Sequence, residues 1–139
     1  MSNRHSSRAA IAVLAVLCAA TAPGRAQAPA VFTRVRGAWD CVSYNTSGQT
    51  ALVLTLSVQD GRLVGGMQEP PRGTTPIENA ALRGDTLSFA LLGGMINYRL
   101  HVSGDSLHGY WLVSAPGNPA DGDRGVFRAA RRPGQRRAP

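Results

Sequence analysis

Two histidines form the pair of residues in this sequence that is best suited to metal chemistry. His101 and His108 flank Gly104-Asp105, a dipeptide that favours a two-residue turn and would place the two imidazoles directly opposite each other. Two imidazoles at that separation could share a metal ion. Their alternation with Leu100 directs both outward, Arg99 on the same face would repel a cation, and no third ligand is visible. The pattern therefore predicts two exposed histidines and no metal site.

Glu78 is a carboxylate that the strand pattern could direct into an apolar interior. It alternates with Ala80 and Leu82, which should face inward. A carboxylate in that position could anchor the polar group of a ligand. A β-bulge or a frayed strand end would instead leave Glu78 in solvent, and the sequence leaves both alternatives open.

Tyr98 and Trp111 are predicted to be an inward-facing pair on neighbouring strands. Core packing is the ordinary role of such a pair, although each ring has a polar tip that could also meet a ligand. Cys41 shares the face of Trp39 and should be a buried, inert thiol, because a nucleophile needs a base and both strand histidines face away.

Patterns that support catalysis are missing from the sequence. It contains no paired acids, no Ser/His/Asp spacing, no phosphate-binding glycine loop and no zinc-ligand spacing. We therefore expect a protein that is not an enzyme and that uses no cofactor.

The strands that position these residues are predicted from tight turns. Dipeptides that tolerate positive φ separate alternating apolar runs at Asp60-Gly61, Gly84-Asp85, Gly93-Gly94 and Gly104-Asp105. A two-residue turn sets the register of its hairpin, and the last three turns share strands and agree on one apolar face. The predicted strands are Gly37–Tyr44, Thr50–Gln59, Arg62–Gln68, Pro76–Arg83, Thr86–Leu92, Met95–Ser103, Ser106–Ser114 and Arg124–Arg131.

Eight antiparallel strands with one apolar face predict an all-β, up-and-down (meander) β-barrel, because closure removes exposed edges. A two-sheet sandwich is the alternative fold. The turns at Asp60-Gly61, Gly84-Asp85 and Gly104-Asp105 would share one tightly closed end, and the longer loops would gather at the other end. Function more often lies at the end with the variable loops.

Composition divides the chain into four segments. Residues 1–28 have the form of a signal peptide, with a basic start, an apolar run and Ala26-Gln27-Ala28 as a cleavage site. Residues 29–36 are interpreted as a linker, residues 37–131 as the barrel and residues 132–139 as a disordered basic tail. Most of the excess positive charge lies in the signal and the tail, which argues against nucleic-acid binding and leaves the barrel nearly neutral. Only Cys41 remains after cleavage, so no intramolecular disulfide can form.

The start of the first strand carries a family resemblance. Gly37-Ala38-Trp39 has the form Gly-x-Trp, and Gly-Asp-x-Leu recurs in Gly84-Asp85-Thr86-Leu87 and Gly104-Asp105-Ser106-Leu107. With eight meandering strands, this resembles the calycin superfamily, and most closely short, avidin-sized, secreted bacterial lipocalin-like domains. The resemblance implies that Trp39 closes the base of the barrel and that an arginine near the end of the last strand, here Arg131, packs over it.

Two functions remain open on the sequence alone. The first is a non-enzymatic, secreted or periplasmic binding protein for a small apolar molecule, with no stable membrane insertion after signal cleavage. Its tentative binding residues are Leu54, Met67, Glu78, Ala80, Phe89, Leu91, Tyr98 and Trp111. The alternative is an inhibitor-like module with a packed core that contacts a protein partner through the loops Asn45–Gln49, Glu69–Thr75 and Ala115–Asp123. The interior decides between them, because a barrel of this size can be packed or hollow.

Overall fold

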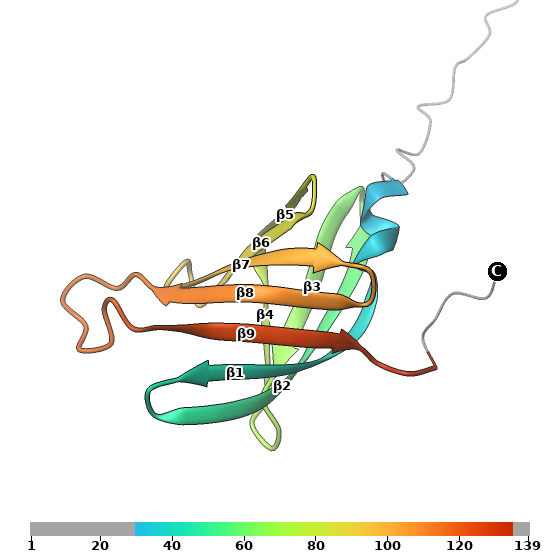
Figure 1. Ribbon diagram of the computed structural model, residues 1–139. Coiled ribbons are helices and arrows are strands. Elements are labelled where there is room, and N and C mark those ends of the chain that lie inside the picture. Colours follow the sequence, from blue (N-terminus) through green and yellow to red (C-terminus); the bar gives the residue numbers. More distant parts are fainter. Residues whose placement is uncertain (1–29, 135–139) are drawn as a thin grey trace, which may run out of the picture.

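Nine antiparallel strands and a short 3-10 helix make up the part of the chain that the computed structural model describes, residues 30–134 (Figure 1). The elements are η1 (Ala30–Arg34), β1 (Gly37–Asn45), β2 (Gly48–Gln59), β3 (Arg62–Gln68), β4 (Thr74–Pro76), β5 (Glu78–Arg83), β6 (Thr86–Leu91), β7 (Ile96–Ser103), β8 (Ser106–Val113) and β9 (Arg124–Arg131). The predicted signal peptide and the end of the predicted tail lie outside the described residues.

The strands form a single up-and-down sheet that curls into a nearly closed barrel. Its order is β4-β3-β2-β1-β9-β8-β7-β6-β5. Strands that follow each other in the chain therefore pair, with the exception of β4 and β5, and β9 also pairs with β1. The seam lies between β3 and β5, where the amide of Ile77 donates to the carbonyl of Gly65 at 3.0 Å. The predicted all-β meander is confirmed, with nine strands in place of eight.

The extra strand, β4, consists of Thr74 and Thr75 from the predicted loop Glu69–Thr75 and of Pro76 from the predicted strand Pro76–Arg83. The chain pairs with β3 as β4 and then crosses to β6 as β5, which accounts for the rest of that predicted strand after Ile77. A register shift follows between Glu78 and Ala81, where Asn79 has a φ of 51°. A bulge of this kind adds a residue to one strand and reverses the direction of the side chains beyond it.

The register around the predicted tight turns agrees with the structure. Leu56 pairs with Gly65, Leu100 with Gly109, and Tyr98 with Trp111. One loop differs, because Asn45 pairs with Gly48 and leaves a two-residue turn in place of the predicted loop Asn45–Gln49. The Asn45 Oδ1 atom accepts a hydrogen bond from the amide of Ser47 at 2.8 Å, which stabilises this turn without a glycine at its centre.

Alternating inward side chains fill most of the barrel. The largest fully buried ones are Trp39, Phe127, Leu54, Leu87, Leu100, Leu107 and Val35. Among residues 30–134 no polar or charged residue is buried, so packing of apolar groups is the main source of stability. Val35 belongs to the segment interpreted as a linker, which is instead a structured part of the core.

Candidate functional site

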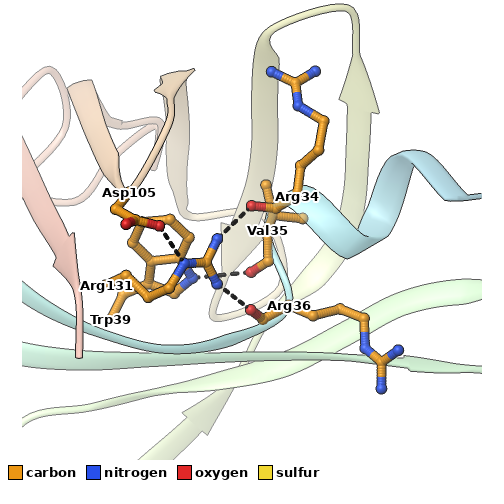
Figure 2. A network of polar contacts seen from close by, with 6 residues as sticks. All are labelled: Arg34, Val35, Arg36, Trp39, Asp105 and Arg131. Atoms are coloured by element: carbon orange, nitrogen blue, oxygen red, sulfur yellow. Dashed lines mark hydrogen bonds and ion pairs between the residues drawn. The ribbon is translucent and has the colours of Figure 1, made fainter. Parts of the chain in front are cut away.

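One end of the barrel is closed by η1 and the residues that follow it. The Trp39 ring is fully buried, and its Nε1 atom donates to the carbonyl of Val35 at 2.9 Å (Figure 2). The Arg131 guanidinium lies 4.3 Å from the centre of the Trp39 ring. The two residues that the calycin resemblance brings together are therefore in contact at the base of the barrel.

Arg131 fastens this closed end through three polar contacts. Its Nε atom donates to Asp105 Oδ1 at 2.9 Å, and its terminal nitrogens donate to the carbonyls of Arg34, at 2.6 Å, and of Arg36 (Figure 2). Arg34 in turn pairs with Asp85 at 2.6 Å and holds the pKa of that carboxyl below its usual range. These contacts join η1 to the β5–β6 and β7–β8 turns at this end of the barrel.

The opposite, open end contains a cavity of about 450 Å³. Its apolar lining comes from inward positions of five strands and one turn: Leu52, Met67, Leu91, Leu92, Ile96, Tyr98 and Trp111. Its polar lining comes from β1, β2 and the β3–β4 segment: Ser43, Asn45, Thr50, Glu69, Arg72, Thr74 and Thr75. Apolar walls with a few polar groups are typical of small-molecule sites.

The charges of the cavity lie at its rim. Arg72 and Glu69 approach to 3.8 Å, and their side chains are 80% and 40% exposed. An ion pair this exposed contributes little to stability. Among residues 30–134, no buried charged side chain lines the cavity.

Aromatic contacts hold Tyr98 in the cavity wall. Its ring stacks on Phe89 at 4.7 Å and meets the edge of Phe127 at 5.4 Å. Burial, with smaller contributions from Cys41 and Glu69, raises the pKa of Tyr98 to about 12. The side chain therefore presents a neutral hydroxyl at physiological pH.

Trp111 lies opposite Tyr98 and packs over Gly125 of β9. A Cβ atom at Gly125 would collide with Cε2 and Cζ2 of the indole at 2.6 Å, so only glycine leaves room for this ring. The Nε1 atom of Trp111 is buried and has no hydrogen-bond partner. An unpartnered buried donor is uncommon in proteins and calls for an explanation.

No protein-family model, no curated protein and no solved structure matches this chain. The strand order and near-closure of the sheet are consistent with a calycin-like fold. Across residues 30–134, no helix is both long enough and apolar enough to span a bilayer.

Four of the predicted binding residues lie together in the cavity wall: Met67, Leu91, Tyr98 and Trp111. Three others do not line it. Leu54 is fully buried one layer deeper, Phe89 packs against Tyr98, and Ala80 packs against the core beside the bulge. The cavity is thus confined to the open end.

Glu78 is placed outside the barrel. It pairs with Ala90, which lies between the inward residues Phe89 and Leu91 and therefore faces the other way. Its Oε1 atom accepts a hydrogen bond from the amide of Gly93 at 3.2 Å. Of the two alternatives for this residue, the bulge is the one that the structure contains, and it removes Glu78 from the cavity mouth.

Strand alternation could have identified three lining residues that were missed. Ser43 continues the inward series of Trp39 and Cys41, Leu52 precedes Leu54 by two positions, and Ile96 faces Leu91 across its turn. The β3–β4 residues carry no such signal, because loop conformation does not follow a period.

The histidine pair and Cys41 lack the surroundings of a reactive site. The rings of His101 and His108 lie 5.0 Å apart and are exposed, and no group of three His, Cys, Asp or Glu within residues 30–134 could hold a metal. Burial raises the pKa of the Cys41 thiol to about 12, which keeps it protonated and unreactive.

A second surface of interest covers the outer wall of β1, β9, β8 and β7. One row across these strands contains Tyr44, Val126, Tyr110 and Arg99. Arg124 and Arg128 flank Val126, and none of the ion pairs in the described residues involves these three arginines. We call the set of Tyr44, Arg99, Tyr110, Leu112, Arg124, Val126 and Arg128 the outer face.

Proposed function

We propose that this protein binds a small, mainly apolar molecule in the open end of its barrel and catalyses no reaction on it. The observation that supports this proposal is the cavity of about 450 Å³ between inward-facing apolar side chains. Its size lies within the range of roughly 300–1,000 Å³ that is typical of small-molecule sites. A barrel that served only as a scaffold would gain stability by filling this space.

The asymmetry of the barrel supports the same proposal. Trp39, Arg131 and η1 pack together at one end, so a ligand would enter at the open end, between the β3–β4 segment and the β6–β7 turn. Apolar side chains are buried around the cavity, while polar side chains gather at its rim. This gradient would favour a molecule that enters with its apolar part first.

The proposal includes a calycin-like ancestry and export from the cytoplasm. Gly37-Ala38-Trp39 opens β1, as the calycin resemblance implies, and residues 1–28 have the sequence features of a signal peptide. Intact-mass analysis of the periplasmic protein should give a start between Pro23 and Pro29. A full-length chain retained in the inner membrane would contradict export.

Titration with the apolar fluorophore N-phenyl-1-naphthylamine tests binding. The fluorophore should bind saturably at one site per chain. Ser43→Phe, which places a large ring in the cavity wall, should weaken binding by more than about tenfold. Ser57→Phe is the matched control, because Ser57 is exposed on the outside of β2 and its replacement should leave binding within about twofold of wild type.

Two outcomes would overturn the proposal: no saturable binding to the wild type, or equal binding by the wild type and a folded cavity-filling variant. Circular dichroism establishes that each variant is folded. Leu91→Trp fills the same cavity from β6 and serves as the second filling variant if Ser43→Phe does not fold.

A second candidate function is docking of an anionic partner, and the outer face favours it over the predicted loops. Tyr44, Tyr110, Leu112 and Val126 are between 39% and 53% exposed there, beside three arginines outside any described ion pair. Arg124→Glu combined with Arg128→Glu should abolish binding to an acidic partner and leave the binding of N-phenyl-1-naphthylamine unchanged. Unchanged partner binding by this variant would exclude the outer face.

A further inference from the structure

Exposed hydrophobic side chains gather at the open end of the barrel. In the described part of the chain, large hydrophobic side chains are exposed at six positions: Val31, Tyr44, Leu92, Tyr110, Leu112 and Val126. Four of them belong to the outer face, and Leu92 lies on the β6–β7 turn at the rim of the cavity. Single exposed hydrophobic residues are ordinary on protein surfaces, whereas a group of them indicates an interaction site.

The outer face adjoins the mouth of the cavity. Tyr44 and Leu112 lie next to the last residues of β1 and β8, and Val126 lies near the start of β9. These strand ends are on the side of the barrel opposite η1 (Figure 1). A shallow depression, whose lining includes Gly94 of the β6–β7 turn and Tyr110, extends from that turn onto the outer face. The exposed hydrophobic side chains of the outer face are thus connected to the rim of the cavity.

Leu92 at this rim has an unusual backbone conformation. Its φ is 54°, in the left-handed region that a bulky residue rarely adopts, and the residue is 55% exposed. Backbone strain of this kind is concentrated at functional sites in proteins. The Leu92 side chain would lose its contact with water if the rim met an apolar phase, which favours such a contact.

The charge of the outer face is positive. Arg99, Arg124 and Arg128 belong to it, and none of them takes part in an ion pair of the described residues. Within β1, β7, β8 and β9 the one acidic residue is Asp40, which pairs with Arg132 at 2.7 Å. An anionic partner on these strands would therefore meet three arginines and no unpaired carboxylate.

The mixture of residue types distinguishes a lipid surface from other anionic partners. Nucleic acid is bound by basic side chains and by aromatic rings that stack on its bases, and the aliphatic Leu112 and Val126 serve neither purpose. Exposed leucine and valine are stabilised when they enter the acyl region of a bilayer, tyrosine prefers the membrane interface, and arginine pairs with lipid phosphate. The outer face carries each of these residue types.

We infer that the outer face and Leu92 dock the protein on an anionic lipid bilayer, with the open end of the barrel at the membrane surface. This inference rests on the second candidate function, since it names the partner of the same face. An apolar molecule partitions from water into a bilayer. A protein docked in this way would exchange such a molecule between its cavity and the membrane without exposing it to bulk water.

Sedimentation with vesicles tests the inference. The wild type should bind vesicles of equal parts phosphatidylglycerol and phosphatidylcholine at least about tenfold more tightly than vesicles of phosphatidylcholine alone. Arg124→Glu combined with Arg128→Glu should abolish this preference. Arg62→Glu combined with Arg83→Glu is the matched control, because it changes the net charge equally at exposed arginines outside the outer face and should leave binding within about threefold.

The apolar contribution has its own variants. Leu112→Ser keeps every charge and should weaken binding to the mixed vesicles by at least about fivefold, because it removes a side chain that enters the bilayer. Val31→Ser is the control, since Val31 is exposed on η1 at the closed end and its replacement should leave binding within about twofold. Val126→Ser serves as a second test variant if circular dichroism shows that Leu112→Ser is not folded.

The outcomes separate the claims. If the charge reversal weakens vesicle binding but neither serine variant does, the face attracts an acidic macromolecule and not a bilayer, so the inference fails while the docking function stands. No binding to the mixed vesicles, or equal losses in a variant and its control, would also overturn the inference. Binding of N-phenyl-1-naphthylamine without vesicles is measured separately, and its absence would contradict the cavity function alone.

Discussion

Arg131 and Arg132 are neighbours in the sequence, but their side chains have different surroundings. The Arg131 side chain is 10% exposed, stacks on Trp39 and donates to Asp105 and to two carbonyls (Figure 2). Arg132 pairs with Asp40 at 2.7 Å, and both side chains are about half exposed. The two arginines therefore form a matched pair for a stability experiment.

Arg131→Ala should lower the free energy of unfolding by roughly 2–4 kcal/mol, because it removes a nearly buried guanidinium with three hydrogen bonds and uncovers the indole of Trp39. Arg132→Ala should lower it by less than about 1 kcal/mol, because exposed ion pairs contribute little. Urea unfolding of the two variants measures both values. Equal effects would show that the closed end does not depend on Arg131.

Two buried groups that ionise at alkaline pH, the Cys41 thiol and the Tyr98 hydroxyl, should make the stability of the protein depend on pH. Burial raises the pKa of Cys41 from 9.0 to about 12 and that of Tyr98 from 10.0 to about 12. As pH rises above these ordinary values, the unfolded chain releases protons that the folded chain retains, so unfolding becomes more favourable. Their stabilising effect is fully present below about pH 9 and is lost as pH rises toward 12.

Cys41→Ala isolates one of these groups. Between about pH 9 and pH 10 the wild type should lose about 1 kcal/mol of stability through Cys41, and the variant should lose less. Urea unfolding at a series of pH values gives both slopes. Parallel slopes would show that the thiol ionises as readily in the folded protein as in the unfolded one.

At the scale of elements, glycines in strand interiors allow close approach of neighbouring strands. A Cβ atom at Gly109 of β8 would collide with the backbone carbonyl of Arg99 on β7, and one at Gly65 of β3 would collide with that of Thr55 on β2. Backbone atoms cannot rotate away as a side chain can. These glycines let the sheet coil tightly enough to approach closure.

Gly109→Ala should therefore lower the free energy of unfolding by roughly 1–3 kcal/mol, because β7 and β8 must separate to admit the methyl group. Gly73→Ala is the control, since no atom lies within 4 Å of a Cβ atom there and its φ is not in the left-handed region. Thermal unfolding compares them. If Gly109→Ala is as stable as Gly73→Ala, the tight coiling does not require glycine at this position.

The elements also show what the sequence could and could not predict. Two-residue turns set the register of β2–β3 and of β6–β7–β8 correctly, because local turn chemistry determines which side chains face each other. A bulge beside Glu78 was one of the open alternatives, and the sequence could not decide it, since Asn79 is not a glycine and the register shift depends on the switch from β3 to β6. That single bulge is why Glu78 was an open question and why it lies outside the barrel.

At the scale of the whole molecule, the barrel combines a fastened end with a hollow one. The calycin resemblance predicted that Trp39 and Arg131 lie at the closed end. It did not predict the hydrogen bonds from Arg131 to the carbonyls of Arg34 and Arg36, because residues 29–36 were interpreted as a linker. The cavity could not be predicted either. Its volume is the space that side chains from several strands and from the β3–β4 segment leave unfilled. That volume depends on the packing of residues far apart in the sequence, so no local sequence pattern predicts it.

The most direct test of the account is to locate a bound apolar molecule within the barrel. Intermolecular nuclear Overhauser effects can be recorded between N-phenyl-1-naphthylamine and the methyl groups of the saturated protein. We expect contacts from the naphthyl protons to the methyl groups of Met67, Leu91 and Ile96, which line the cavity at the open end. Contacts confined to the methyl groups of Leu112 and Val126 on the outer face, or no contacts in a saturated sample, would contradict binding in the cavity.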